Sequence, residues 1–283
     1  MSTVLSPATS RSRLHPADLL RVGSVGLVTR RVRAALSGLG IAIGIAAMVA
    51  VLAISESSKA DLLADLDKLG TNLLTVTPGQ TLGGDTASLP PAAPGMLGRI
   101  GPVERTSATG TVKATVRRTD RIPKTETGSI SVKAATTDLL ETLGGRLASG
   151  RFLDAATERY PVVVLGAVAA ERLGISDVAN RPQVYLGDQW FSVVGILQPV
   201  ALASEVDRSA LVGFPVAVER LDADGTPSTI YVRSEPEAVE EVRSVLAATA
   251  NPEAPEEVTV SRPSDALEAR AAAKTAFTSL FLG

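Results

Sequence analysis

The chain has 283 residues, a formal net charge of −2, no cysteine, one histidine and only 3% aromatic residues. This charge balance gives no reason to expect a nucleic-acid partner, and the absence of cysteine excludes a disulfide-stapled scaffold. The scarcity of aromatic side chains argues against stacking platforms and against a carbohydrate cleft.

Residues 1–33 form a polar start followed by an amphipathic stretch. Pro16 suits a first helical turn, and Asp18 stands where a helix N-terminus favours an acid. We predict a cytoplasmic tail with an amphipathic helix on the inner membrane surface. A solvated juxtamembrane linker is the alternative.

Residues 34–55 contain no charged side chain and are rich in Leu, Ile and Val. A helix of this length measures about 33 Å, which is enough to cross a bilayer core of about 30 Å. We therefore predict a retained transmembrane helix. The alternatives are a cleaved twin-arginine signal, suggested by Arg30 and Arg31 after Thr29, and a buried helix of a soluble protein.

The flanking charges predict the orientation of this helix. Arg30, Arg31 and Arg33 precede it, whereas only Lys59 and Lys68 follow within a similar distance. Because basic residues stay in the cytoplasm, we expect the N-terminus inside the plasma membrane and the main domain outside.

The expected membrane helix carries Gly38, Gly40 and Gly44. The last two form a small-xxx-small pair, which allows another helix to approach closely. We predict a helix-packing face here.

Residues 56–70 continue the helix beyond the membrane as a stalk. They lack proline, and Leu62, Leu66 and Leu69 recur at helical spacing as a stalk seam. Gly70 is the expected C-cap. One rod of about 54 Å would result.

Short apolar runs separated by Gly and Pro signals indicate a mixed α+β domain after the stalk. Residues 80–102 are rich in Gly and Pro and are expected to be a loop. Gly187-Asp188 is the expected turn of a two-residue hairpin. The expected strands are 72–77, 111–118, 129–135, 162–165, 183–186 and 189–196, with short helices at 138–143 and 168–173 and a further apolar run at 211–216.

The last part of the domain reads as a β-α-β unit. A strand at 230–233 is followed by Ser234 and Glu237 in the spacing of a capping box. A second strand is expected at 257–260. The helix between them is expected to bury Val239, Val242, Val245, Leu246 and Thr249.

Residues 264–283 begin as a helix and become apolar at Phe277. Too few residues follow Lys274 to cross a membrane. We expect the start of a second, truncated span. The alternative is a C-terminal helix that docks on the domain.

The sequence offers no catalytic, cofactor or metal site. His15 is the only histidine, so a Ser-His-Asp triad and a His/Cys zinc site are excluded. The dipeptide Gly-Lys never occurs, so the chain lacks the P-loop of an ATPase. Four scattered carboxylates are read as solvated rather than as a glycosidase-type pair: Asp154, Glu158, Glu205 and Asp207.

Four stretches resemble one family. They are LSGLGIAIGIAA (36–47), LGTNLLTVTPG (69–79), SGRFLDAATERYPVVVLGAVAAERLG (149–174) and WFSVVGILQPV (190–200). In order and spacing they resemble the MacB-type permeases of ABC transporters, which are distantly related to the FtsX-like permeases.

The resemblance implies an α+β fold in which one transmembrane helix extends into a stalk. A porter-like βαβ subdomain would comprise 71–135 and 219–262, with a β-rich Sabre-like subdomain inserted at 136–218. Residues 263–283 would form a return helix and the start of the second span. Thr71 and Asn72 match the family motif, and we expect them to cap backbone groups where the rod meets the sheet.

The resemblance also implies the partners. ATP would bind to a separate ABC ATPase subunit, and a second permease protomer, identical or related, would lie beside this one in the lipid. The chain would transmit ATP-driven motion to its outer domain for export or extraction of a substrate. The alternatives are an FtsX-like regulator of a cell-wall hydrolase and a twin-arginine-exported soluble domain.

Overall fold

A computed structural model of the chain describes residues 31–69, 72–81, 84–126, 128–269 and 273. The chain divides into two compact units, Met1–Asp61 and Leu62–Gly283, and each is considered by itself. The expected amphipathic helix before Arg31, the arginine at position 30 and the apolar residues from 277 onward lie outside the described residues.

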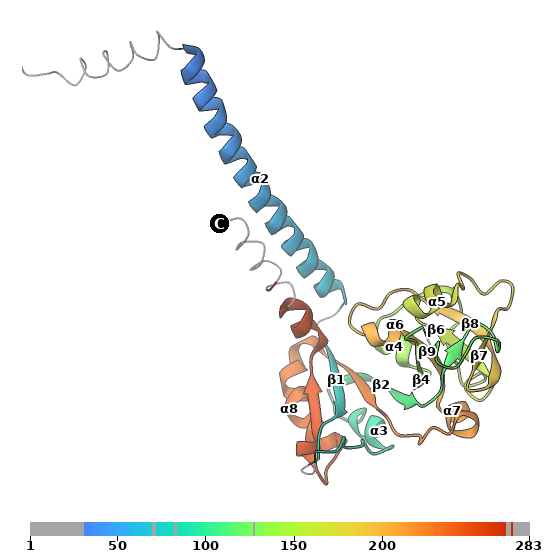
Figure 1. Ribbon diagram of the computed structural model, residues 1–283. Coiled ribbons are helices and arrows are strands. Elements are labelled where there is room, and N and C mark those ends of the chain that lie inside the picture. The colour runs from blue at the N-terminus through green and yellow to red at the C-terminus, as the bar shows by residue number, and fades with distance from the viewer. Residues whose placement is uncertain (1–30, 70–71, 82–83, 127, 270–272, 274–283) are drawn as a thin grey trace, which may run out of the picture. The chain divides into compact units, whose positions relative to one another are not determined.

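Helix α2 (Arg31–Leu69) is the longest element (Figure 1). Its 39 residues correspond to about 58 Å of helix. Between Arg31 and Val51 the described side chains are exposed on all sides of the helix, and they include Leu36, Ile41 and Met48. A helix that is apolar all round needs a lipid or protein environment.

The described residues of the second unit contain eleven strands in one sheet, in the order β11-β1-β10-β2-β4-β9-β6-β8-β7-β3, with β5 paired to β8. The strands are β1 (Leu73–Pro78), β2 (Val103–Val112), β3 (Val116–Arg117), β4 (Ser131–Ala135), β5 (Leu147–Gly150), β6 (Val162–Leu165), β7 (Gln183–Leu186), β8 (Gln189–Leu197), β9 (Ser209–Gly213), β10 (Thr229–Ser234) and β11 (Val258–Ser261). The helices are α3 (Ala93–Leu97), α4 (Leu139–Thr142), α5 (Ala167–Leu173), α6 (Ser204–Asp207), α7 (Phe214–Leu221) and α8 (Val239–Ala250), with 3₁₀ turns at Pro236–Ala238 and Pro255–Glu257.

The first half of the sheet consists of β11, β1, β10 and β2, all antiparallel. Helices α3 and α8 cover one of its faces and enclose an apolar cluster that includes Leu74, Val76, Ile230 and Leu246. Along β10, Ile230 and Val232 face this cluster, whereas Tyr231 lies on the opposite face, where it and Leu73 of β1 join the apolar cluster of the second half.

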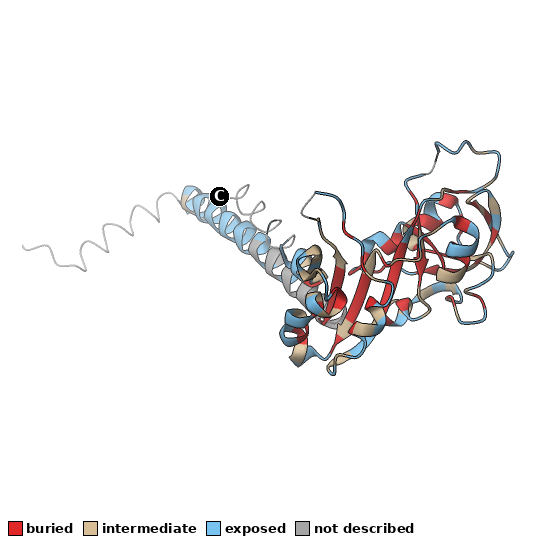
Figure 2. Cartoon of the chain, turned by 90° about the horizontal axis from the view of Figure 1, so that it is seen from below, coloured by how far each residue is buried: buried red, intermediate tan, exposed pale blue. Residues whose placement is uncertain are grey.

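The second half consists of β3 to β9. Two pairings, β4 with β9 and β6 with β8, are parallel. Both faces are apolar: Val163 and Phe191 belong to one buried cluster, and Val164 and Leu211 to the other. Figure 2 shows the buried strands running through the middle of this domain.

The hairpin of β7 and β8 confirms the prediction from Gly187-Asp188. Both turn residues have positive φ, 54° and 62°, as a type I′ turn requires. The strand predicted at 162–165 is also confirmed, with the same ends as β6.

The prediction of a loop at 80–102 is wrong in part. Residues 93–97 form α3, and Leu89, Ala93 and Leu97 are fully buried against α8 and the first half of the sheet. Pro94 lies in the first turn of α3, where a proline is tolerated, and burial of the apolar residues holds the segment in the core.

The apolar run 211–216, for which no secondary structure was predicted, belongs to β9 up to Gly213 and to α7 from Phe214. Two predictions about the last elements are corrected. Ser234 is the last residue of β10 and its buried hydroxyl has no hydrogen-bond partner, so it does not cap the following helix. That helix buries Ala250 instead of Val245, which is 41% exposed, or Thr249.

The expected subdomain boundary at residue 136 does not follow the packing. Val116 in β3 and Val132 in β4 belong to the same buried cluster as Val163 of the second half. Strand β4 pairs with β2 on one side and with β9 on the other, so the two halves share one continuous sheet.

Candidate functional site

The structure places the expected helix-packing glycines on an open surface. A Cβ built at Gly38, Gly40 or Gly44 would meet no atom within 4 Å. No described part of this chain therefore occupies that face. Arg31 and Arg33 lie exposed at the start of α2.

The expected stalk seam lies within α2. Leu62, Leu66 and Leu69 are helical, but the surroundings of their side chains lie outside what the structure describes. Gly70 and Thr71 also lie outside the described residues, so the described chain resumes at Asn72.

Asn72 is buried directly before β1, with 7% of its surface exposed. Its side-chain Nδ2 donates to the carbonyl of Ser234, and its own carbonyl accepts from the Ser234 N–H at 3.1 Å. Its Oδ1 accepts from Nη1 of Arg233 at 2.9 Å. One amide thus binds the chain that follows the rod to the end of β10.

Arg233 extends this contact to the second half of the domain. Its Nε donates to the carbonyl of Thr142 at 2.8 Å, at the end of α4. Thr142 in turn bonds the carbonyl of Asp138 through its hydroxyl. A single guanidinium therefore joins the start of β1, strand β10 and helix α4, and we call Asn72, Arg233 and Thr142 the junction cluster.

Burial shapes the electrostatics of the junction cluster. It lowers the pKa of Arg233, while the nearby Glu104 carboxylate acts in the opposite direction. Nη2 of Arg233 is buried without a hydrogen-bond partner. Gly144 adjoins it in a left-handed conformation, and a Cβ there would lie 3.5 Å from Nη2.

A second side chain of β10 also reaches the second half. The hydroxyl of Tyr231 donates to Glu205 on α6. Burial and the Glu205 carboxylate both raise the pKa of Tyr231 well above its ordinary value. Burial lowers the pKa of Lys133 on β4, against the opposing effect of the same carboxylate. Tyr231 and Arg233 are two residues apart on one strand and therefore lie on the same face.

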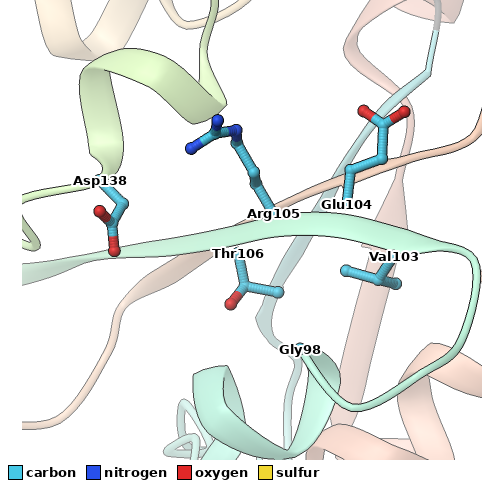
Figure 3. A pocket seen from close by; sticks show the side chains of 6 residues that line it. All are labelled: Gly98, Val103, Glu104, Arg105, Thr106 and Asp138. Carbon is cyan, nitrogen blue, oxygen red and sulfur yellow. The ribbon is translucent and has the colours of Figure 1, made fainter.

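A polar hollow of about 300 Å³ lies where α3, β2 and α4 meet (Figure 3). It is lined by Gly98, Val103, Glu104, Arg105, Thr106 and Asp138. Arg105 reaches toward α4 and forms an exposed ion pair with Glu141. The hollow is at the small end of ligand pockets, and its mixed charges specify no ligand class.

The described residues contain no group of three or more His, Cys, Asp or Glu side chains placed to hold a metal ion. His15 lies outside them. Asp154 caps its own turn through Thr157 and Ala156, and Asp207 accepts the N–H of Val200 at 2.9 Å. Both carboxylates have structural contacts that their positions in the sequence did not reveal.

The sequence analysis did not single out Arg233 or Tyr231, and it interpreted Glu205 as a solvated carboxylate, whereas Glu205 accepts the hydrogen bond of Tyr231. A partial signal existed, because the strand sequence TIYVRS alternates Ile230 and Val232 with Tyr231 and Arg233. The alternation predicts two faces, but it does not say that the second face contacts another part of the domain.

A helix that is long and apolar enough to cross a bilayer, followed in the chain by a mixed sheet, defines the class: an α+β domain with a candidate membrane-spanning helix. The sequence profile of the MacB-like periplasmic core domain matches residues 34–249. The chain belongs to this family, and its resemblance to MacB-type ABC transporter permeases is confirmed.

Two curated relatives, both called macrolide export ATP-binding/permease protein MacB, support this assignment. The protein of Azoarcus sp. (strain BH72) is 31% identical over 235 residues, which cover 75% of this chain and 32% of that protein. The protein of Hyphomonas neptunium is 29% identical over 240 residues, covering 80% and 37%. The chain therefore spans about a third of the length of these relatives.

Two solved structures share the fold. The periplasmic region of MacB from Actinobacillus actinomycetemcomitans aligns with a TM-score of 0.56 at 12% identity, covering 74% of this chain and 97% of that one. The extracellular domain of the ABC-type transporter YknZ from Gram-positive bacteria aligns with a TM-score of 0.53 at 14% identity, covering 67% and 100%. FtsX-like regulation and twin-arginine export stay predictions.

Proposed function

We propose that this chain is the permease component of an ABC transporter and that it transmits motion from a separate ATPase to its extracytoplasmic domain. The observation that carries the proposal is the unbroken helix α2, which runs from an apolar segment long enough to cross a bilayer to Leu69, three residues before Asn72. A continuous helix transmits displacement along its axis because it has no soft joint.

The junction cluster supports the second step of the proposal. Displacement of the chain at Asn72 would act on Arg233 directly through a hydrogen bond, and on α4 through the Thr142 carbonyl. The start of β1 is therefore linked to both halves of the sheet within one cluster of side chains.

The proposed surroundings follow from the flanking charges. Arg31 and Arg33 would face the cytoplasm, and the sheet would lie outside. ATP would be bound by the partner ATPase and not by this chain. A second permease protomer would occupy the open face of Gly38, Gly40 and Gly44.

The test is to break α2 beyond the membrane segment. Ala64→Pro in the complete permease, reconstituted with its ATPase in lipid nanodiscs, removes a helix hydrogen bond and costs about 3 kcal/mol locally. We expect ATP to change amide hydrogen exchange in β1, β10 and α4 of the unmodified protein, and we expect this response to disappear in the variant while ATP hydrolysis continues.

Ala64→Ser is the matched control, because it keeps a small side chain and an intact helix. It should retain the response to ATP. An Ala64→Pro variant whose outer domain still responds to ATP as the unmodified protein does would reject transmission through the helix.

A further inference from the structure

The end of the second half that carries β7 and β8 gathers aromatic side chains that are rare in this chain. It holds Trp190, the only tryptophan of the chain, together with Tyr185 and Tyr160, two of its three tyrosines. Trp190 is 43% exposed and Tyr160 is 63% exposed. We call these three residues the aromatic tip.

Contacts with each other and with Arg117 fix the positions of two rings of the aromatic tip, Tyr185 and Trp190. Tyr185 and Trp190 are directly paired across the hairpin, with ring centroids 5.3 Å apart at 69°. The guanidinium of Arg117 lies 5.2 Å from the centre of the Tyr185 ring, and only 5% of the Arg117 side chain is exposed. Arg117 also donates to the carbonyl of Ile122. The exposed Trp190 therefore stands on a prearranged support, which reduces the entropy lost on binding.

The third ring lies at the same end of the neighbouring strand. Val162 pairs with Ser192 in the parallel β6–β8 ladder, and the N–H of Ser192 donates to the carbonyl of Pro161. Tyr160 stands two residues before Val162, as Trp190 stands two residues before Ser192. Tyr160 lies in the turn that leads into β6, so it stands at the same end of β6 as Trp190 does of the parallel strand β8.

Basic side chains lie near the hairpin that carries two of these rings, and Asp188 in its turn pairs with both Lys124 and Arg117. Arg118 is exposed and donates to the carbonyl of Gln183 on β7. Lys124 is exposed and pairs with Asp188 in the hairpin turn at 2.6 Å. Arg159 is exposed beside Tyr160. The segment 117–126 contains four basic and two acidic residues.

We propose that the aromatic tip is a contact site for an anionic lipid surface. Trp and Tyr rings favour the headgroup level of a bilayer, where one edge is apolar and the other is hydrated. Arg and Lys beside them attract anionic headgroups. This inference rests on the proposed function, because it requires α2 to anchor the chain in a membrane.

A chain anchored in the bilayer meets lipid at a high effective concentration, so a weak site is sufficient.

Trp, Tyr and Arg are also the residues that dominate protein interfaces, so a protein partner is the competing outcome. The lipid surface is favoured because the tip combines exposed rings with several cations and because the anchor supplies this partner without a separate encounter.

The only tryptophan makes the test direct, because the intrinsic tryptophan fluorescence of the full chain reports on Trp190 alone. The chain is placed in nanodiscs of phosphatidylcholine, with or without phosphatidylglycerol, and the lipids carry brominated acyl chains as quenchers. We expect quenching of Trp190 in the anionic discs, weaker quenching in the neutral discs, and loss of the difference at about 0.5 M salt, where charges are screened.

Arg118→Gln with Arg159→Gln removes two cations of the tip. We expect the contact equilibrium to fall about fivefold for each charge removed. Arg99→Gln with Arg243→Gln is the matched control, because it makes the same change in net charge in the first half of the domain. This control should leave the quenching unchanged.

Absence of quenching in a chain that floats with the discs would overturn the lipid site and leave the proposed function standing. Equal quenching in neutral and anionic discs would overturn it too. A third result would also overturn the lipid site. If an added protein protected Trp190 from acrylamide quenching in the absence of anionic lipid, the aromatic tip would be assigned to a protein partner. Failure of the chain to float with the discs would instead contradict the membrane anchor of the proposed function.

Discussion

The two halves of the sheet differ in which faces of their strands carry apolar residues. In the first half, β10 alternates Ile230 and Val232, which face α3 and α8, with Tyr231 and Arg233, which face the other way. In the second half, β6 and β9 are apolar on both faces, and Leu211 and Val212 belong to different buried clusters.

The difference explains where the two halves are joined. The first half leaves one face with polar side chains, including the buried hydroxyls of Ser107 and Thr109. From that face Tyr231 and Arg233 bind Glu205 and Thr142 of the second half. This face, which also carries Leu73 and Tyr231 of the second half's apolar cluster, therefore serves as the contact between the two halves.

The strongest test of the comparison is to truncate neighbouring residues in each half. Leu211→Ala should destabilise the outer domain by about 2–5 kcal/mol and Val212→Ala by about 2 kcal/mol, because both side chains are fully buried. In the first half, Val76→Ala should also cost about 2 kcal/mol, whereas Thr77→Ala should cost under about 1 kcal/mol. Denaturant midpoints from circular dichroism, at unchanged m value, give the change in the free energy of unfolding for each of the four variants.

If Thr77→Ala were as costly as Val76→Ala, the polar face of β1 would contribute as much to stability as its apolar face, and the comparison would be wrong. If either Leu211→Ala or Val212→Ala had almost no effect, the second half would have only one buried face.

A smaller effect is expected from the junction cluster. Arg233→Met keeps the length of the side chain but removes the donors to Asn72 and Thr142. We expect a loss of about 1.5–3 kcal/mol, since these bonds involve a charged group in a partly buried site. Faster amide exchange in α4 than in α8 would show that the loss is centred on the contact between the halves.

Arg105→Met provides the matched control. Arg105 pairs with Glu141 on the same helix α4, but the side chains are 51% and 65% exposed. An exposed pair contributes about 0–1 kcal/mol, so the control should lie near the unmodified protein. Equal losses of unfolding free energy in Arg233→Met and Arg105→Met would mean that the burial of Arg233 does not strengthen its contribution to stability.

The smallest expected effect is a pH dependence at Asp207 in the second half. Burial raises the pKa of this carboxyl, Glu205 raises it further, and the hydrogen bond from Val200 and the charge of Arg208 oppose the rise. An acid with a raised pKa in the folded state contributes stability below its unfolded pKa and loses it as pH rises through the folded value.

Asp207→Asn keeps an acceptor for the Val200 N–H but cannot ionise. The variant should therefore gain stability relative to the unmodified protein near neutral pH, and the gain should shrink as pH falls through the raised folded pKa of Asp207 toward about 4. Melting temperatures of both proteins across this range measure the difference. A gain that stays constant with pH would assign it to packing instead of ionisation.

Local signals were sufficient for several elements. An uncharged apolar stretch predicted the membrane part of α2, and Gly187-Asp188 predicted the hairpin, because both depend on residues within the segment itself. Ser234 and Glu237 gave a false signal for the opposite reason. The spacing of a capping box was present, but pairing of β10 with β1 and β2 kept Ser234 in the strand.

The sequence predicted only one member of the junction cluster. Asn72 was singled out, but its partner Arg233 lies 161 residues away, and no local pattern links the two. The same holds for Tyr231 and Glu205, and for the three aromatic residues that two separate strands and a loop bring to one end of the second half.

The sequence by itself determined the long helix, the faces of the strands and the absence of a P-loop, since hydropathy, alternation and motif spacing act over a few residues. Only the tertiary structure decided that the two halves share one sheet and that Arg233 binds across them. Those contacts depend on strand order, which is set by the burial of the whole domain and not by any single segment.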